Sequence, residues 1–240
     1  VLSPYLWDRG IGALDLVILS HPHPDHMNGL IAVLNNFTVR EVWGSGLDTG
    51  LPGYADFREA VRSRGIPFRQ VAAGDRARIG EADLVVLHPG ASFRQRTKKA
   101  YAAENDRSLV VRLGVAGRSL LFAGDIHGEG ERELRRNAAD LAVDLVKVPH
   151  HGSRTSSTGD LVAVLRPAVA VVTVGDGNPY RHPSQETEAR YREIGAAVYR
   201  TDRHGAIKIR LSPAGLNVLP WSDLLLRQAV PGGPDGWWTI

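Results

Sequence analysis

The sequence contains no cysteine among its 240 residues. The absence of cysteine excludes thiolate metal ligands and a disulfide framework, and it suits an oxidising compartment without proving one. No apolar run approaches the roughly 20 residues that a membrane-spanning helix needs, and no signal peptide opens the chain. Any metal site must therefore be built from histidine and oxygen ligands.

The chain also has almost equal numbers of positive and negative charges, since its formal net charge is only +3. A charge of this size does not indicate nucleic-acid binding by itself. The basic side chains are nearly all arginine, which presents a planar fork to phosphate, although genomic base composition explains that bias equally well. The length and the 43% hydrophobic content predict a single domain over residues 1–240. Because the first residue is Val1, we expect a fragment of a longer protein.

Three histidines and one aspartate are concentrated in six residues near the start of the chain. They are His21, His23, Asp25 and His26. The apolar run at residues 14–19 predicts a buried strand before them, and the apolar positions after Asn28 predict a helix behind them. The first two histidines alternate in a segment that Pro22 and Pro24 hold extended, so their side chains share a face and can bind one cation. The turn that follows brings the aspartate and the third histidine beside them, which indicates a site for divalent transition metals.

This segment, HPHPDH, resembles the H-x-H-x-D-H signature of the metallo-β-lactamase fold. The resemblance implies an α+β protein with the architecture of an αββα four-layer sandwich. Two sheets would pack face to face with helices outside them, and a site for one or two metals would lie at one edge of the sandwich. The signature is specific for the fold and weak for the substrate.

A second buried strand, SLLFAGD, ends at Gly124 and Asp125. In the resembled fold, an aspartate at this place bridges two metal ions. Asp125 would also serve well as the N-cap of the helix that follows. We favour the bridging ligand because the HPHPDH segment lies upstream.

Two adjacent histidines follow a third predicted strand, in the segment KVPHHGS. One of His150 and His151 should complete the second metal site with Asp25 and His26, and the other can hydrogen-bond a phosphate oxygen or a leaving group. The sequence leaves open which histidine does which. Ser153 either holds the loop or reaches substrate oxygens.

The segment NPYRHP at residues 178–183 supplies one more candidate. His182 is either a general acid or phosphate ligand at the rim of the site, or a structural residue before a helix. The residues that we predict to act in catalysis are therefore Asp25, His150, His151 and His182.

Beyond the fold, the chain resembles the C-terminal nuclease-like domain of ComEC-type DNA-internalisation competence proteins. The resemblance extends over about residues 4–209 and rests on five segments: HPHPDH, LLFAGDI, LVKVPHHGS, NPYRHP and YRTDRHGAI. It implies a domain on the outer face of the bacterial cell membrane, attached to that membrane only through other parts of its parent protein. There the domain would degrade the DNA strand that is not imported. The family usually has glycine where this chain has Arg181.

The chain departs from the resembled pattern in two places. An upstream strand with a D-V-G-Q-G-D-type motif is missing, so we expect a sandwich without its first N-terminal strands. At the place where related enzymes supply a third histidine to the first metal, this chain has Asn105 and Asp106. Fewer imidazoles and more oxygen ligands favour Mn²⁺ over Zn²⁺ in a site for two divalent ions. We place Asn105 among the candidate substrate contacts.

A basic run precedes this segment and could contact a DNA backbone. It contains Arg94, Arg96, Lys98 and Lys99. Phe93 and Tyr101 are the only aromatic residues close to this run, which argues against ordered stacking of single-stranded bases there. Without the resemblance, we would expect the run to be a solvated loop.

Together these features predict a metal-dependent phosphodiesterase that acts on DNA, most simply on single strands, with two metal ions activating a water. One alternative is a small-molecule hydrolase that cleaves a phosphodiester, a phosphocholine ester or a lactone. The other is an inactive DNA-binding module. The sequence does not indicate an oligomeric state.

Overall fold

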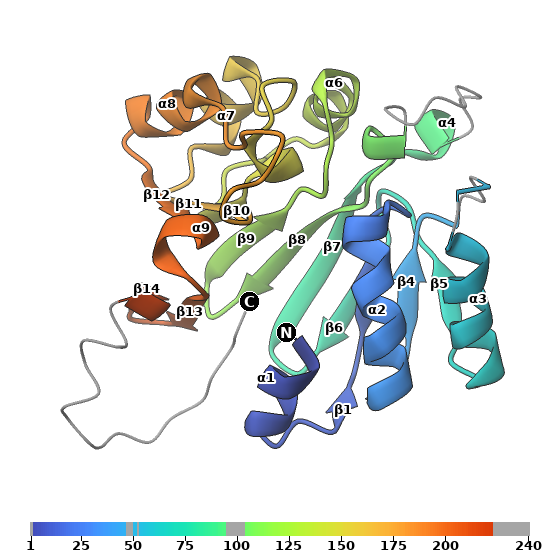
Figure 1. Ribbon diagram of the computed structural model, residues 1–240. Coiled ribbons are helices and arrows are strands. Elements are labelled where there is room, and N and C mark those ends of the chain that lie inside the picture. Colours follow the sequence, from blue (N-terminus) through green and yellow to red (C-terminus); the bar gives the residue numbers. More distant parts are fainter. Residues whose placement is uncertain (1, 47–49, 52, 95–103, 223–240) are drawn as a thin grey trace.

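Figure 1 shows the computed structural model, which describes residues 2–46, 50–51, 53–94 and 104–222. Its largest sheet has seven strands in the order β12-β11-β10-β9-β8-β7-β6. These strands are β6 (Arg76–Ile79), β7 (Ala82–His88), β8 (Val110–Val115), β9 (Arg118–Phe122), β10 (Leu145–Lys147), β11 (Val169–Val172) and β12 (Ala197–Arg200). Strands β6 to β9 are antiparallel neighbours, and β9 to β12 run parallel.

A smaller sheet of three parallel strands carries the HPHPDH segment at its end. It consists of β2 (Val17–Leu19), β4 (Val42–Gly44) and β5 (Phe68–Gln70). Two further strand pairs are β1 (Ala13–Leu14) with β3 (Thr38–Val39), and β13 (Ile207–Ser212) with β14 (Gly215–Pro220). The strand predicted over residues 14–19 is therefore wrong in its bounds, because Asp15 and Leu16 separate β1 from β2. Strand β14 was not predicted.

The helices lie on the outside of these sheets (Figure 1). One group is α1 (Leu2–Asp8), α2 (Pro24–Asn36) and α3 (Tyr54–Ser63), and the other is α6 (Gly128–Asn137), α7 (Gly159–Leu165) and α8 (Gln185–Glu193). Three shorter turns complete the described part of the chain: α4 (Ala91–Arg94), the 3₁₀ helix η1 (Pro149–Gly152) and α9 (Thr201–His204). Residues 91–104 were expected to form a loop, and helix α4 replaces the start of that loop. None of the described helices combines the length and the hydropathy needed to cross a bilayer.

Three separate hydrophobic clusters fill the spaces between the layers. Leu34 and Phe57 pack in the cluster between the first helix group and the small sheet. Trp43, fully buried, lies in the cluster between the two sheets. Leu134 and Leu161 pack in the cluster between the large sheet and the second helix group. Three apolar interfaces require four layers, so the predicted αββα sandwich is confirmed.

Helix α2 begins at Pro24, four residues earlier than the helix predicted from Asn28. Proline is well tolerated in the first turn, where its missing N–H would lack a helical partner in any case. His23 forms the N-cap with extended backbone angles, and Asp25 lies in the first turn, where a negative charge complements the helix dipole. The early start therefore places the second half of the HPHPDH segment on the helix rather than in a turn.

Candidate metal centre

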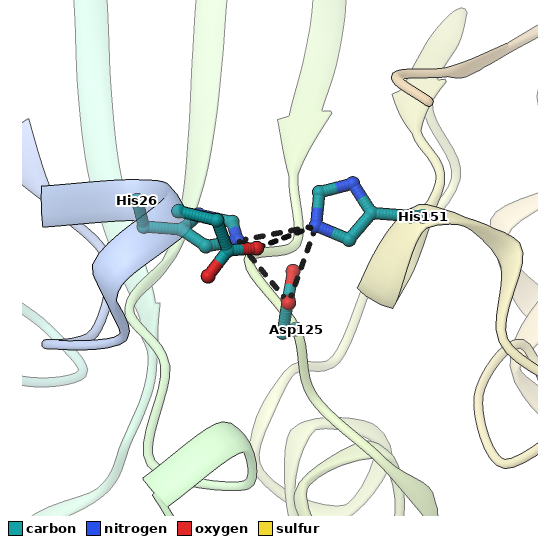
Figure 2. Close-up of side chains that lie close together, drawn as sticks. His26, Asp125 and His151 are labelled. Atoms are coloured by element: carbon teal, nitrogen blue, oxygen red, sulfur yellow. Dashed lines mark hydrogen bonds and ion pairs between the residues drawn. The ribbon is translucent and has the colours of Figure 1, made fainter. Parts of the chain in front are cut away.

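Four side chains from three separate parts of the chain meet at one edge of the sandwich. They are Asp25, His26, Asp125 and His151, and each offers a ligand atom that lies within 4.8 Å of the other three. The first two come from α2, the third follows β9, and the fourth lies in η1 after β10. Figure 2 shows the rings of His26 and His151 converging on the carboxylate of Asp125.

The distances within this cluster suit a bound cation. His26 Nε2 lies 3.1 Å from Asp125 Oδ2 and 3.3 Å from His151 Nε2. Asp25 Oδ2 lies 3.5 Å from His26 Nε2 and 3.3 Å from His151 Nε2. Ligand atoms that bind a tetrahedral ion at about 2.1 Å lie roughly 3.4 Å from one another. The four side chains therefore fit one divalent ion.

Neighbouring groups orient the imidazoles of the site. His151 Nδ1 donates a hydrogen bond to Thr173 O at 2.6 Å, which leaves Nε2 with its lone pair directed at the cluster. Ser20 Oγ lies 3.1 Å from His21 Nδ1 and 3.5 Å from His26 Nδ1. Partners on Nδ1 favour metal binding through Nε2 in all three rings.

His21 and His23 lie behind this cluster, buried and side by side. Their exposed fractions are 1% and 4%, and their ring centroids are 4.5 Å apart. His21 Nε2 lies 3.8 Å from Asp125 Oδ2 and has no hydrogen-bond partner within the described residues. Burial, followed by the neighbouring His26, lowers the pKa of His21 to about 2, so the ring is neutral. Asp125 therefore lies between two groups of histidines, as a bridging ligand would.

Lys147 is a feature of this site that the sequence analysis missed. Its Nζ lies 3.5 Å from Asp125 Oδ1, and it donates a hydrogen bond to Gly124 O at 3.4 Å. Burial lowers the pKa of Lys147, and the Asp125 carboxylate opposes that shift. Burial of Asp125 opposes its ionisation, yet the hydrogen bond with His26 and the charge of Lys147 hold its pKa well below the usual range. The lysine is the last residue of β10, in the same segment as the two histidines, so its position at a strand end was the available signal.

His150 does not join the cluster of Asp25, His26, Asp125 and His151. It has φ +46° and His151 has φ +52°, so two successive residues in the left-handed region send their rings in different directions. His150 Nδ1 lies 2.6 Å from His127 Nε2, with the two rings stacked, and its ring centroid is 5.6 Å from that of His182. Burial lowers the pKa of His150 to about 4.

His127 was not among the predicted site residues, although it follows Asp125 by only two positions. Asn105 Nδ2 lies 3.2 Å from His127 Nε2, the same ring nitrogen that approaches His150 Nδ1. The structure therefore brings Asn105, His127, His150 and His182 together beside the metal cluster.

The remaining predicted residues are less closely connected with the site. Ser153 is buried, and its hydroxyl lies 3.0 Å from Thr155 Oγ1 within the same loop. Asp106 Oδ1 accepts hydrogen bonds from His127 N and Gly130 N at the start of α6. The side chain of Arg94 and the residues Arg96, Lys98 and Lys99 lie outside the described residues.

The buried histidines make the metal-free fold sensitive to acid. Between about pH 6.5, the ordinary histidine pKa, and about pH 4, the unfolded chain binds a proton at His150 that the folded chain does not. This contribution is therefore lost as pH falls through that window, and it is fully present above it. In EDTA, we expect the melting temperature to fall more steeply between pH 7 and pH 4 for the parent than for His150→Gln. Parallel curves for the two proteins would contradict this assignment.

Residues 1–175 match the metallo-β-lactamase superfamily. The chain belongs to this superfamily. Its similarity to the solved structure of CmlA, a diiron β-hydroxylase from Streptomyces venezuelae, has a TM-score of 0.52 at 15% identity and covers 87% of this chain and 45% of that one. An identity this low shows the shared fold alone, and that fold agrees with the four layers described above.

The chain is also similar to curated proteins that include a competence protein by name. The chain is 30% identical to ComE operon protein 3 of Bacillus subtilis over 210 residues, which cover 88% of this chain and 26% of that protein. It is 29% identical to competence protein ComA of Neisseria gonorrhoeae over 216 residues, which cover 90% and 28%. The predicted resemblance to ComEC-type proteins is confirmed. The chain spans about a quarter of the length of these relatives.

Proposed function

We propose that this metallo-β-lactamase domain is a metal-dependent phosphodiesterase that hydrolyses DNA in a competence protein. The observation that carries the proposal is the convergence of Asp25, His26, Asp125 and His151 on one point at a sheet edge. Superfamily members are mostly metal-dependent hydrolases, and the curated relatives are competence proteins. DNA is the substrate that connects a hydrolytic site with these relatives.

The arrangement supports two ions that share Asp125. Asp25, His26, Asp125 and His151 would hold one, and His21 and His23 would hold the other with Asp125. Divalent ions in such sites activate a water nucleophile and stabilise charge on the phosphate. Lys147 beside Asp125 Oδ1 already supplies one fixed positive charge at the shared ligand.

The residues outside the metal cluster suit contact with the phosphate. His150, whose Nδ1 contacts His127, can exchange a proton with the substrate through its other ring nitrogen. His182 lies beyond His150 at the rim of the site. Arg94, Arg96, Lys98 and Lys99 would neutralise backbone phosphates along the approach.

The proposal extends to the choice of metal, through the ligand set, and to the cellular location, through the relatives. Asn105 stands where related enzymes have a third histidine for the ion at His21 and His23. Because that ion has fewer imidazole ligands, we expect Mn²⁺ to sustain more activity than Zn²⁺. By analogy with its competence relatives, the domain would lie on the extracytoplasmic face of the cell membrane and reach the membrane only through the rest of its parent protein.

A cleavage assay on linear single- and double-stranded DNA tests the proposal, with the metal-free protein reloaded with Mn²⁺ or Zn²⁺. We expect cleavage in Mn²⁺, less in Zn²⁺ and none in EDTA, and Asp125→Asn controls for a contaminating nuclease. Equal or higher turnover with stoichiometric Zn²⁺ would contradict the metal preference. Turnover of small diesters or lactones without DNA cleavage would indicate a small-molecule hydrolase. Retention of DNA without cleavage would indicate a binding module.

A further inference from the structure

Tyr180 is an exposed aromatic residue close to the metal centre. Its exposed fraction is 78%, the largest among the exposed large hydrophobic residues that the structure describes. It lies in the connection between β11 and α8, and its ring is nearly parallel to that of His182, with an interplanar angle of 20° and a centroid distance of 5.8 Å. One face of the tyrosine ring is directed to His182, and the rest is open to solvent.

A series of ring contacts leads from Tyr180 to the metal ligands. The centroid of His182 lies 5.6 Å from that of His150, which lies 6.3 Å from that of His151. His151 is a member of the candidate metal cluster. A phosphate held at the cluster would therefore have the tyrosine within reach of an adjacent nucleotide.

The connection that presents Tyr180 is held in place on both sides. The Asn178 side chain accepts a hydrogen bond from His182 N at 2.8 Å and donates one to His182 O at 2.9 Å, which closes the segment around Tyr180. Ser184 N donates to Gly152 O at 2.8 Å, and a Cβ added at Gly152 would lie 2.5 Å from Pro183 Cβ. These contacts fix Tyr180 relative to the turn that carries His150 and His151.

Arg181 adds a positive charge beside the tyrosine. Its backbone lies in the left-handed region at φ +55°, where a residue with a Cβ is less stable than glycine. The side chain is exposed and makes no hydrogen bond or ion pair with any residue in the described part of the chain. A strained arginine without a partner of its own is available to a ligand phosphate.

We infer that Tyr180 is a stacking platform for an unpaired base of the DNA substrate, next to the phosphate at the metal centre, and that Arg181 contacts a neighbouring phosphate. Aromatic rings stack on any base, so the platform would not read sequence. This inference rests on the proposed function, because it takes DNA as the substrate. The sequence argued against ordered base stacking at the basic run, and this inference places the stacking at Tyr180 instead.

Binding of a labelled single-stranded oligothymidylate, measured by fluorescence anisotropy in calcium, tests the platform. Tyr180→Ala should raise Kd about tenfold, whereas Tyr180→Phe should bind as the parent does. On an oligonucleotide with abasic sites, the parent and Tyr180→Ala should bind equally. Trp7→Ala is the matched control, because Trp7 is 54% exposed and packs on Phe37 at the far end of α2.

Several outcomes would overturn the platform. They are an unchanged Kd for Tyr180→Ala, a Kd for this variant that stays above the parent's on the abasic strand, and a Kd for Tyr180→Phe that rises as much as that of Tyr180→Ala. A parent that does not bind the strand would also overturn it. Cleavage is measured separately: a parent that shows the tyrosine-dependent binding but does not cut DNA would refute the hydrolytic function and leave the platform standing.

Arg181→Gly tests the second contact through the salt dependence of binding. Loss of one phosphate contact on a single strand should flatten the slope of log K against log salt by about 0.7. The melting temperature should not fall, because glycine tolerates the positive φ. An unchanged slope would remove Arg181 from the binding site.

Discussion

Replacing Asp125 by alanine should remove more bound metal than any single histidine replacement in the site. Asp125 Oδ2 lies 3.1 Å from His26 Nε2, 3.6 Å from His151 Nε2 and 3.8 Å from His21 Nε2, so one carboxylate faces both groups of imidazoles. Loss of a group that merely orients a metal ligand typically lowers metal affinity or activity 10- to 100-fold. Loss of this ligand itself should therefore lower activity more than about 100-fold. Elemental analysis after dialysis measures the metal, and a DNA cleavage assay measures the activity.

Two further variants separate loss of the ligand from loss of the fold. Asp144 directly precedes β10, and its carboxylate accepts hydrogen bonds from Ser119 and Arg118 at the start of β9. Asp144→Ala should lower stability and keep the metal. Because Asp125→Ala leaves the Lys147 ammonium without its counter-charge, the double variant with Lys147→Met should regain stability and remain metal-free. Full metal content in folded Asp125→Ala protein would refute the shared-ligand arrangement.

The sequence supported the fold because its strongest signals are local. The helix after the HPHPDH segment and the buried strand that leads to Asp125 are each confirmed as elements. Their bounds were harder to predict, since Pro24 can begin a helix as well as hold an extended segment. Strand β14 was missed because its pairing with β13 is the main evidence for it.

The site was less accessible to sequence reasoning, because its partners are set by distance in space. The choice between His150 and His151 depends on two successive positive φ angles, which no pattern of residue types reveals. His127 approaches His150 from the start of α6, and His182 approaches it from the connection after β11. Each of these contacts joins segments that only the packing of the layers brings together.

A second large effect is expected from Glu131, a fully buried carboxylate on α6. It accepts hydrogen bonds from Ser157 N, Thr158 N and Thr158 Oγ1, in the loop that joins the histidine-bearing turn to α7. Burial raises the pKa of Glu131, and these three hydrogen bonds oppose the shift. The carboxylate thus satisfies two backbone N–H groups, one of them on the fully buried Ser157.

Glu131→Ala should therefore lower the free energy of unfolding by about 3 kcal/mol or more, since each unsatisfied buried donor costs about 1–3 kcal/mol. Glu131→Gln retains one acceptor oxygen and should lose less. Glu193→Ala, which removes an exposed carboxylate on α8, is the matched control and should change stability little. Chemical denaturation measures all three. Below its melting temperature, Glu131→Ala should still bind metal, because the carboxylate holds the loop and does not belong to the metal cluster. A variant of full stability, or a stable one that has lost its metal, would contradict this role.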